Sequence, residues 1–215
     1  MRFIAFEKVI PQINKLSLPG FETQLKMAPL FRENLLERFK ETQKSAKLAA
    51  VLALFYPSGT GETNLVLILR KVYKGIHSAQ VGFPGGKPEI DDTSLLDTAL
   101  RETWEEIGVS SDKITVLREL TSIYIPPSNF QVHPFIGISN KQLKFKLQVS
   151  EVDAVIEVPL SDFLNDNYEV TSKILDANGT THSVPAFKLK GQIVWGATAM
   201  VLVEIKTILN LVLKK

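Results

Sequence analysis

The stretch that most constrains this 215-residue chain is GGKPEIDDTSLLDTALRETWEEIGV, residues 85–109. A glycine pair opens it, Ser94 suits a helix N-cap with Asp97 as its capping-box partner, and Gly108 suits the C-terminal stop. These signals predict an amphipathic helix of about three and a half turns. The glycine turn and the two helix ends together fix where the side chains of this helix lie relative to the turn.

The predicted helix separates packing residues from charged ones, because successive side chains are rotated by roughly 100°. The expected packing face consists of Leu96, Leu100, Thr103, Trp104 and Ile107. Glu102, Glu105 and Glu106 gather about 150° away from it, where like charges cost a few tenths of a kcal/mol per pair. A divalent cation would remove that cost, and Mg²⁺ or Mn²⁺ accepts carboxylates together with water and substrate phosphates. Arg101, four residues before Glu105, can orient that carboxylate.

A glutamate pair alone would be an exposed helix face, since Glu is mostly exposed. The spacing here, however, resembles the Nudix box, G-x5-E-x7-R-E-U-x-E-E-x-G-U with U aliphatic. The matching positions are Gly86, Arg101, Glu102, Glu105, Glu106, Gly108 and Val109, and Thr103 takes an aliphatic slot. Fourteen residues separate Gly86 from Arg101 where the general pattern has thirteen. The first acidic position is therefore open between Asp92 and Glu89.

The extra residue resembles the coenzyme A pyrophosphatase branch of the family, whose lead-in is similar to H-x-G-Q-V-x-F-P-G-G-K. This chain reads HSAQVGFPGGK over residues 77–87, and SNFQVHPFIG (128–137) and VPAFKLKGQIVWGATAMVL (184–202) also resemble that branch. In patches the resemblance covers about residues 28–205. Two positions depart from that branch: Ala79 stands where the branch usually has glycine, and Gly75 stands where it often has arginine. Either difference could change how the adenosine end of a substrate is held.

The resemblance implies an α/β fold, a Nudix-like α/β/α sandwich with a mixed sheet and extra N-terminal helices. It also implies Mg²⁺- or Mn²⁺-dependent hydrolysis of a diphosphate, with coenzyme A split into 3′,5′-ADP and 4′-phosphopantetheine. Glu102, Glu106 and Glu105 would hold metal, and Glu105 and Arg101 would serve catalysis. The candidates for substrate binding are Gly85, Gly86, Lys87, His77 and Arg70, and the weaker acidic candidates are Glu151, Glu89 and Asp92. Exposed cations and an ordinary loop histidine remain the alternatives for Arg70, Lys87 and His77. The alternative functions are hydrolysis of ADP-ribose, a dinucleotide or a nucleoside triphosphate, and a non-catalytic nucleotide sensor.

The remaining elements are predicted from periodicity and turn residues. Residues 1–47 form a helical extension, with one helix interrupted by Pro11 and another over residues 30–42, and residues 48–215 form the Nudix domain. We assign the extension either a structural role or a role as a subunit interface, and a homodimer is therefore one of the alternatives. The expected strands cover residues 48–56, 64–70, 113–125, 130–139, 152–159 and 167–195, with a hairpin turn at Asn178–Gly179 and a helix over residues 195–215.

Composition excludes several other classes of protein. The net charge of +2 gives no sign of a nucleic-acid partner, and the absence of cysteine excludes disulfides and thiolate chemistry. The N-terminus does not resemble a signal peptide, and we expect no membrane partner and a cytoplasmic location. A small nucleotide, with coenzyme A as the first choice, is the expected partner.

Overall fold

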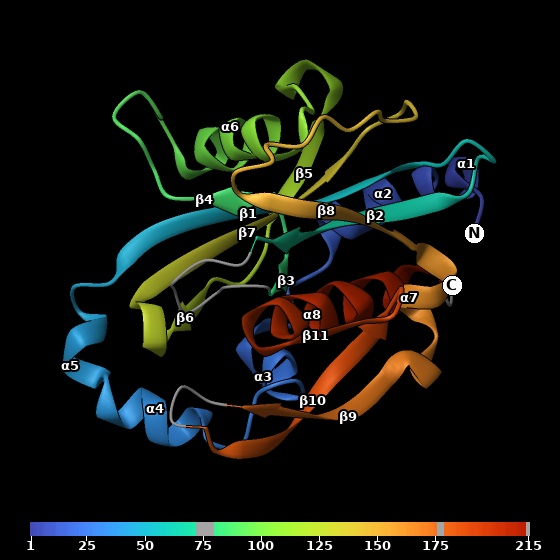
Figure 1. The fold of residues 1–215 in the computed structure, drawn as a ribbon. Helices are drawn as coiled ribbons and strands as arrows, with labels where there is room; N and C mark the ends of the chain where they lie inside the picture. The colour runs from blue at the N-terminus through green and yellow to red at the C-terminus, as the bar shows by residue number, and fades with distance from the viewer. Residues whose placement is uncertain (72–79, 176–178, 214–215) are drawn as a thin grey trace.

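The computed structural model describes residues 1–71, 80–175 and 179–213, which fold into a mixed sheet between helices (Figure 1). Strands β3, β2, β1, β7 and β5 follow one another across the eight-stranded sheet; β4 pairs with β1, β6 with β7 and β8 with β2. Strands β1 and β7 are parallel, and the other pairs are antiparallel. The strands are β1 Lys47–Pro57, β2 Thr63–Arg70, β3 Val81–Gly82, β4 Gly85–Gly86, β5 Thr115–Glu119, β6 Ile123–Ile125, β7 Phe130–Ile138 and β8 Val152–Pro159.

Helices cover both faces of this sheet, which gives the three-layer α/β arrangement that the sequence predicts (Figure 1). Helix α6 lies on one face, and α8 lies below the other, beside a second sheet of three antiparallel strands. These elements are α6 Leu95–Ile107, α8 Gly196–Leu213, β9 Glu169–Leu175, β10 Thr181–Leu189 and β11 Gln192–Trp195. The short helices are α1 Phe3–Glu7, α2 Ile10–Lys15, α3 Gly20–Leu25, α4 Arg32–Arg38, α5 Lys40–Gln43 and α7 Leu160–Leu164.

Strand β1 serves two hydrophobic cores because its side chains alternate between the faces of the sheet. Leu52 and Leu54 belong to the core under α6, whereas Ala53 and Phe55 belong to the core that α8 and the N-terminal helices close. Phe6 of α1 packs against Phe55, with ring centroids 5.2 Å apart. Helix α8 is long and apolar enough to cross a membrane, but 61% of it is buried within this protein. Its apolar composition is explained by the core that it fills.

The segment before α6 fills a gap between two strands. Strands β1 and β2 pair only near their hairpin, at Phe55–Pro57 and Thr63–Leu65. Further along β1, the glycine pair of β4 takes over the pairing opposite Ala50 and Val51. The glycine pair is therefore fixed to the middle of the sheet before α6 begins.

Most of the predicted elements are present, and α6 has the two caps that the sequence predicts. The side chain of Ser94 accepts a hydrogen bond from the Asp97 N–H at 3.1 Å, and Gly108 ends α6 with φ of 73°. The hairpin of β1 and β2, the strand 152–159, the pairing of β9 with β10 and the C-terminal helix are confirmed. Asn178 lies outside the described residues.

The predicted interruption near Pro11 is present, because α1 ends at Glu7 and α2 begins at Ile10 with Pro11 in its first turn, where the missing N–H costs nothing. Two other expectations for the helices are wrong. The helix expected over residues 30–42 is divided into α4 and α5 at Phe39, and α3 was not foreseen. On α6, Trp104 is 57% exposed rather than packed, because the helix rests on the sheet through its small residues Ala99 and Thr103.

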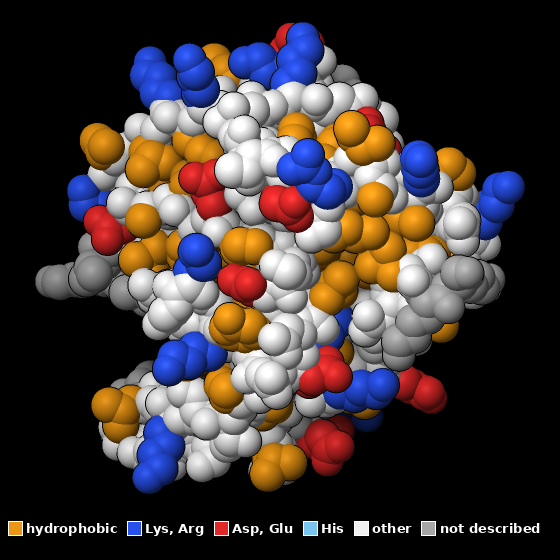
Figure 2. Space-filling view, turned by 90° about the vertical axis from the view of Figure 1, so that its right-hand side faces the viewer, with side chains coloured by type: hydrophobic (Ala, Val, Ile, Leu, Met, Phe, Trp, Pro, Cys, Tyr) orange, Lys and Arg blue, Asp and Glu red, His pale blue; other side chains and the backbone are white. Residues whose placement is uncertain are grey.

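Charged residues of both signs are interspersed on the face of the molecule that Figure 2 shows, with hydrophobic atoms between them. This mixture agrees with the small net charge of the chain. That face offers no extended surface of one sign such as a polyanionic partner would require.

Candidate active site

The glycine pair of β4 brings the main chain into contact with both the sheet and α6. Gly85 has φ of +148°, and a Cβ there would lie 2.3 Å from the Ala50 carbonyl oxygen. A Cβ on Gly86 would lie 2.3 Å from the carboxylate of Glu102. Contact with the main chain therefore requires glycine at the first position, whereas at the second position the Glu102 carboxylate occupies the space that a side chain would take.

Glu106 is buried between this turn and β2, with only 1% of the residue exposed. Its Oε2 accepts a hydrogen bond from the Gly85 N–H at 2.8 Å, and its Oε1 lies 3.1 Å from Nη2 of Arg70. Oε1 has an ion-pair partner but no donor in hydrogen-bond geometry among the described residues. Burial raises the pKa of Glu106 to about 7, against the opposing effects of Arg70 and the Gly85 N–H. Sequence periodicity placed Glu106 on the exposed face, so its burial corrects that prediction.

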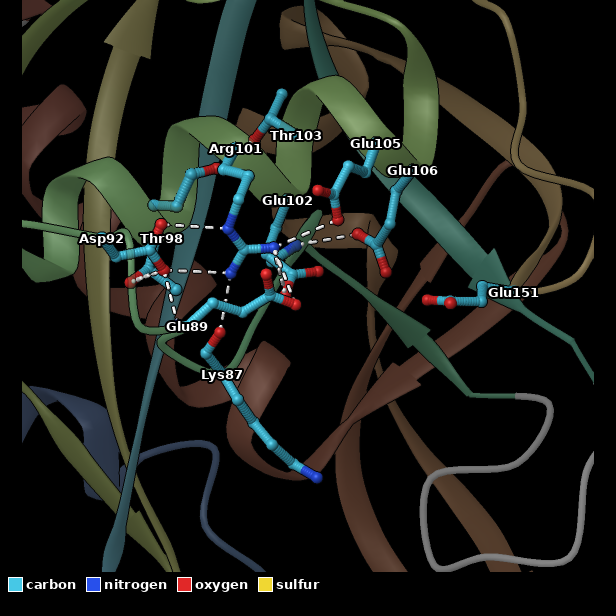
Figure 3. A network of polar contacts seen from close by, with 12 residues as sticks. Lys87, Glu89, Asp92, Thr98, Arg101, Glu102, Thr103, Glu105, Glu106 and Glu151 are labelled. Carbon is cyan, nitrogen blue, oxygen red and sulfur yellow. Dashed lines mark hydrogen bonds and ion pairs between the residues drawn. The ribbon is translucent and has the colours of Figure 1, made fainter.

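Arg101 joins the start of α6 to the carboxylates further along the helix (Figure 3). Its Nε and Nη2 each lie 3.0 Å from an oxygen of Asp92, and Nη2 also donates to the Lys87 carbonyl at 2.8 Å. Its Nη1 lies 3.2 Å from Glu102 and 3.1 Å from Glu105. The expected contact with Glu105 is present, but the two-point contact with Asp92 is the stronger geometry.

Asp92 and Glu89, the two candidates for the first acidic position, have different environments. Asp92 also accepts hydrogen bonds from the Glu89 N–H at 2.9 Å and from the Thr98 hydroxyl at 2.8 Å. The Glu89 side chain is 66% exposed and lies 3.8 Å from Arg101. Hydrogen bonds from Arg101 lower the pKa of Asp92 well below its usual range. Asp92 therefore anchors the arginine, and Glu89 contributes a weak outer contact.

Replacing Asp92 by Asn is expected to lower the free energy of unfolding by about 1–3 kcal/mol at pH 7, because hydrogen bonds between charged groups are lost. The folded-state pKa of Asp92 is depressed, so its stabilisation is fully present above the unfolded value of about 3.9 and is lost progressively as the pH falls from there through the depressed folded-state pKa. Urea unfolding at pH 7 and at about pH 3 measures both. The difference between wild type and Asp92→Asn should shrink in acid. Asp91→Asn, a change at an exposed neighbour, is the matched control; an equal loss there would contradict the assignment.

The carboxylates near the turn have the donor chemistry that a hard divalent cation requires. Burial is the main cause that raises the pKa of Glu102 and of Glu106. The negative charges of Glu105 and Glu151 add to the rise for Glu102, and those of Glu102 and Glu151 add to the rise for Glu106. Within the described residues, no three carboxylate or imidazole groups converge to hold a metal by themselves. Mg²⁺ is commonly held by one or two carboxylates, with water and substrate phosphates completing its coordination, so these residues fit such an ion.

Glu105 lies differently from the other two glutamates of the helix. Its carboxylate contacts Arg101, and its side chain is 37% exposed. The compact cluster of three carboxylates expected from the helical wheel is therefore replaced by Glu102 and Glu106 around the glycine turn, with Glu105 held beside Arg101. Figure 3 shows Glu151, which comes from the chain just before β8, on the side of Glu106.

A cavity of about 420 Å³ extends from this acidic group into the space between the sheet and α8. One part is polar, and there the predicted residues Arg70, Lys87, Glu102 and Glu151 line it beside the glycine pair. The other part is apolar and is lined by Phe83, Ile123, Ile125, Phe130, Val132 and Val201. Lys87 Nζ lies 5.5 Å from the centroid of the Phe130 ring, so the cation stands where the two parts meet.

Sequence reasoning missed the apolar wall, although a signal for it existed. Ile123 and Ile125 alternate with polar residues, as do Phe130 and Val132, which is the pattern of a strand with one apolar face. The cavity is formed only when these strands meet α8, which is distant in sequence. His77, together with Gly75 and Ala79, lies outside the described residues.

Comparison with known proteins identifies the class to which this fold and site belong. The family model described as the NUDIX domain matches residues 46–177. An uncharacterized Nudix hydrolase, NudL of Yersinia enterocolitica, is 33% identical over 141 residues, which cover 66% of this chain and 71% of that protein. The chain therefore belongs to the Nudix family of hydrolases, which act on pyrophosphate bonds and generally use divalent metal ions.

Solved structures of related proteins are more distant in sequence. A MutT protein from Methanosarcina mazei Go1 is 17% identical, covers 77% of this chain and 96% of its own, and has a TM-score of 0.49. The NUDIX domain of NrtR from Shewanella oneidensis, complexed with ADP ribose, is 21% identical, covers 55% and 76% of the two chains, and has a TM-score of 0.44.

Proposed function

We propose that this Nudix hydrolase cleaves the diphosphate of coenzyme A or a derivative of it, with release of 3′,5′-ADP and 4′-phosphopantetheine. One observation carries the proposal. Three separate segments that resemble the coenzyme A branch, 77–87, 128–137 and 184–202, contribute residues to the same cavity. Segments that are far apart in sequence and carry the resemblance therefore meet where a substrate would bind.

The two parts of the cavity suit the two ends of such a substrate. Arg70 and Lys87 place positive charge beside the glycine turn, where a diphosphate would bind. The apolar wall can pack against a pantetheine arm or an adenine ring. A ligand that carries a diphosphate between two large groups would contact both parts at once.

We assign the metal ligands to Glu102 and Glu106, with Glu151 as the additional acidic residue at the cavity. A bound Mg²⁺ or Mn²⁺ would neutralise diphosphate charge and lower the pKa of a coordinated water. Arg101 orients Glu102 and Glu105 through its contacts with both, and Asp92 fixes the guanidinium. Glu105, which is partly exposed and held by Arg101, serves as the base or as a further ligand.

The test is product identification by mass spectrometry after incubation of the protein with Mg²⁺ and, in separate reactions, coenzyme A, ADP-ribose, NADH and nucleoside triphosphates. We expect 3′,5′-ADP from coenzyme A, with the reaction lost when a chelator removes the metal. Cleavage of another compound alone would retain the Nudix reaction and discard coenzyme A as substrate. Saturable binding without any cleavage would favour a non-catalytic nucleotide sensor.

A further inference from the structure

Arg32, at the start of α4, is a buried cation outside the candidate active site. Only 7% of the residue is exposed, and its Nη2 donates to the Tyr124 carbonyl at 2.6 Å. Its Nε is buried without a hydrogen-bond partner among the described residues, and none of their carboxylates lies within ion-pair distance of it. A buried guanidinium is normally paired, because removing its charge from water is costly. Arg32 thus lacks the anion that its burial calls for.

A crevice of about 410 Å³ lies against Arg32, between helices α4 and α5 and strands β6 and β7. Its polar lining is rich in hydrogen-bond donors and comprises Lys40, Gln43, Ser122 and Gln131. Gln131 Nε2 donates to the Ser122 oxygen at 2.9 Å, which leaves the Ser122 O–H available to donate. The single acid of the lining, Glu37, is largely exposed and lies 4.0 Å from Lys40. Phe21, Leu36 and Tyr124 complete the lining. Two cations and three neutral donors therefore share one space with these side chains and one peripheral carboxylate.

The crevice is separate from the cavity of the candidate active site. Ser122 and Tyr124 line the crevice, whereas Ile123 and Ile125 line the cavity. Alternate residues of a strand point to opposite faces, so β6 is the wall between the two spaces. The same alternation holds on β7, where Gln131 belongs to the crevice and its neighbours to the cavity. A ligand in the crevice would thus be a different molecule from a substrate in the cavity.

We propose that this crevice is a second binding site, for a phosphoryl group, with Arg32 and Lys40 as its cations and Gln43, Ser122 and Gln131 as neutral donors. The planar fork of a guanidinium matches the oxygen spacing of a phosphate and forms charge-assisted hydrogen bonds with it. The guanidinium of Arg32 would gain the anion that its burial calls for. The phosphoryl group is supplied by inorganic phosphate or by the end of a small phosphate monoester.

Calorimetric titration of the metal-free full chain with inorganic phosphate, and separately with glycerol phosphate, tests the proposal. We expect one saturable site that Lys40→Met weakens by about tenfold, the effect of losing one charge-assisted contact. Lys44→Met is the matched control, because Lys44 is equally exposed and pairs with Glu41. Lys87→Met removes a cation from the other cavity and should leave this binding unchanged. Binding of both probes identifies a monoester end group as an acceptable ligand, and binding of phosphate alone identifies the free ion.

Arg32→Met should abolish the binding. If that variant does not fold, Lys40→Met and Gln43→Leu still decide, because both replace side chains in exposed positions. The proposal is overturned if wild type binds neither probe saturably at millimolar concentration. It is equally overturned if the binding survives Lys40→Met and Gln43→Leu and disappears with Lys87→Met, since the anion would then occupy the candidate active site.

Discussion

Glu106→Gln is expected to lower kcat by about 10²–10⁴-fold, the range that positioned carboxylates contribute in catalysis. The substitution removes the negative charge that a cation needs while it preserves the shape of the side chain. The amide oxygen can still accept the hydrogen bond from the Gly85 N–H. Arg70 loses its ion pair with Glu106 but keeps its hydrogen bond to the Gly85 carbonyl at 2.7 Å, and its partly exposed guanidinium can be solvated. The fold should therefore survive the loss of activity.

The measurement is steady-state kinetics with Mg²⁺ on the substrate that product analysis identifies, together with thermal unfolding of each variant. Glu102→Gln should show a loss of the same order, because its carboxylate fills the space against Gly86 at the same turn. Glu89→Gln makes the same chemical change at an exposed position before the helix and should retain wild-type kcat. Normal activity in Glu106→Gln or Glu102→Gln would remove that residue from the proposed metal site.

The position of Glu106 shows how far sequence could predict this site. Its helix was predictable because Ser94 and Gly108 are local signals that act within a few residues. Its burial was not, because the helical wheel assigns faces by apolar residues and so placed Trp104 inside. In the folded protein, Ala99 and Thr103 let the helix approach β1 closely, and the carboxylate beside them is enclosed by the glycine turn. That outcome depends on contacts between segments that the sequence separates.

Buried polar residues in the N-terminal part were unpredictable for a related reason. Gln24 of α3 donates to Glu204 of α8 and to the Thr121 carbonyl, each at 2.9 Å, and Thr121 donates to Glu204 at 2.6 Å. Both Gln24 and Glu204 are fully buried, although residues of these types are mostly exposed in proteins. Only the docking of α3 against α8 supplies their partners. Hydrophobic periodicity could therefore identify helices in residues 1–47, but it could not identify which faces of these helices pack against the rest of the protein.

Gly85→Ala should destabilise the protein by about 3–5 kcal/mol, a loss characteristic of steric conflict in a core combined with backbone strain. The added Cβ would lie 2.3 Å from the Ala50 carbonyl oxygen and 2.6 Å from the Val51 Cα. Both are main-chain atoms in the middle of the sheet, so neither can move without separating β4 from β1. Urea unfolding measures the loss. Gly191→Ala is the control, since Gly191 has φ of +80° but nothing within 4 Å of its Cβ position. An equally small loss in both variants would show that β4 can leave β1 freely.

Gly86→Ala should affect activity more than stability, unlike Gly85→Ala. Its Cβ would lie 2.3 Å from the Glu102 carboxylate, which is the far end of a flexible side chain and can swing aside. We therefore expect a loss of stability of no more than about 1 kcal/mol, but a fall in kcat close to that of Glu102→Gln, because the displaced carboxylate no longer lies beside the turn. Urea unfolding and kinetics on the same preparations separate the two effects. Wild-type activity in Gly86→Ala would mean that the observed position of Glu102 is not needed for hydrolysis. The two adjacent glycines would then differ only in their contribution to folding. The geometry instead predicts that Gly85 is needed for the pairing of β4 with β1 and that Gly86 is needed for the position of the Glu102 carboxylate.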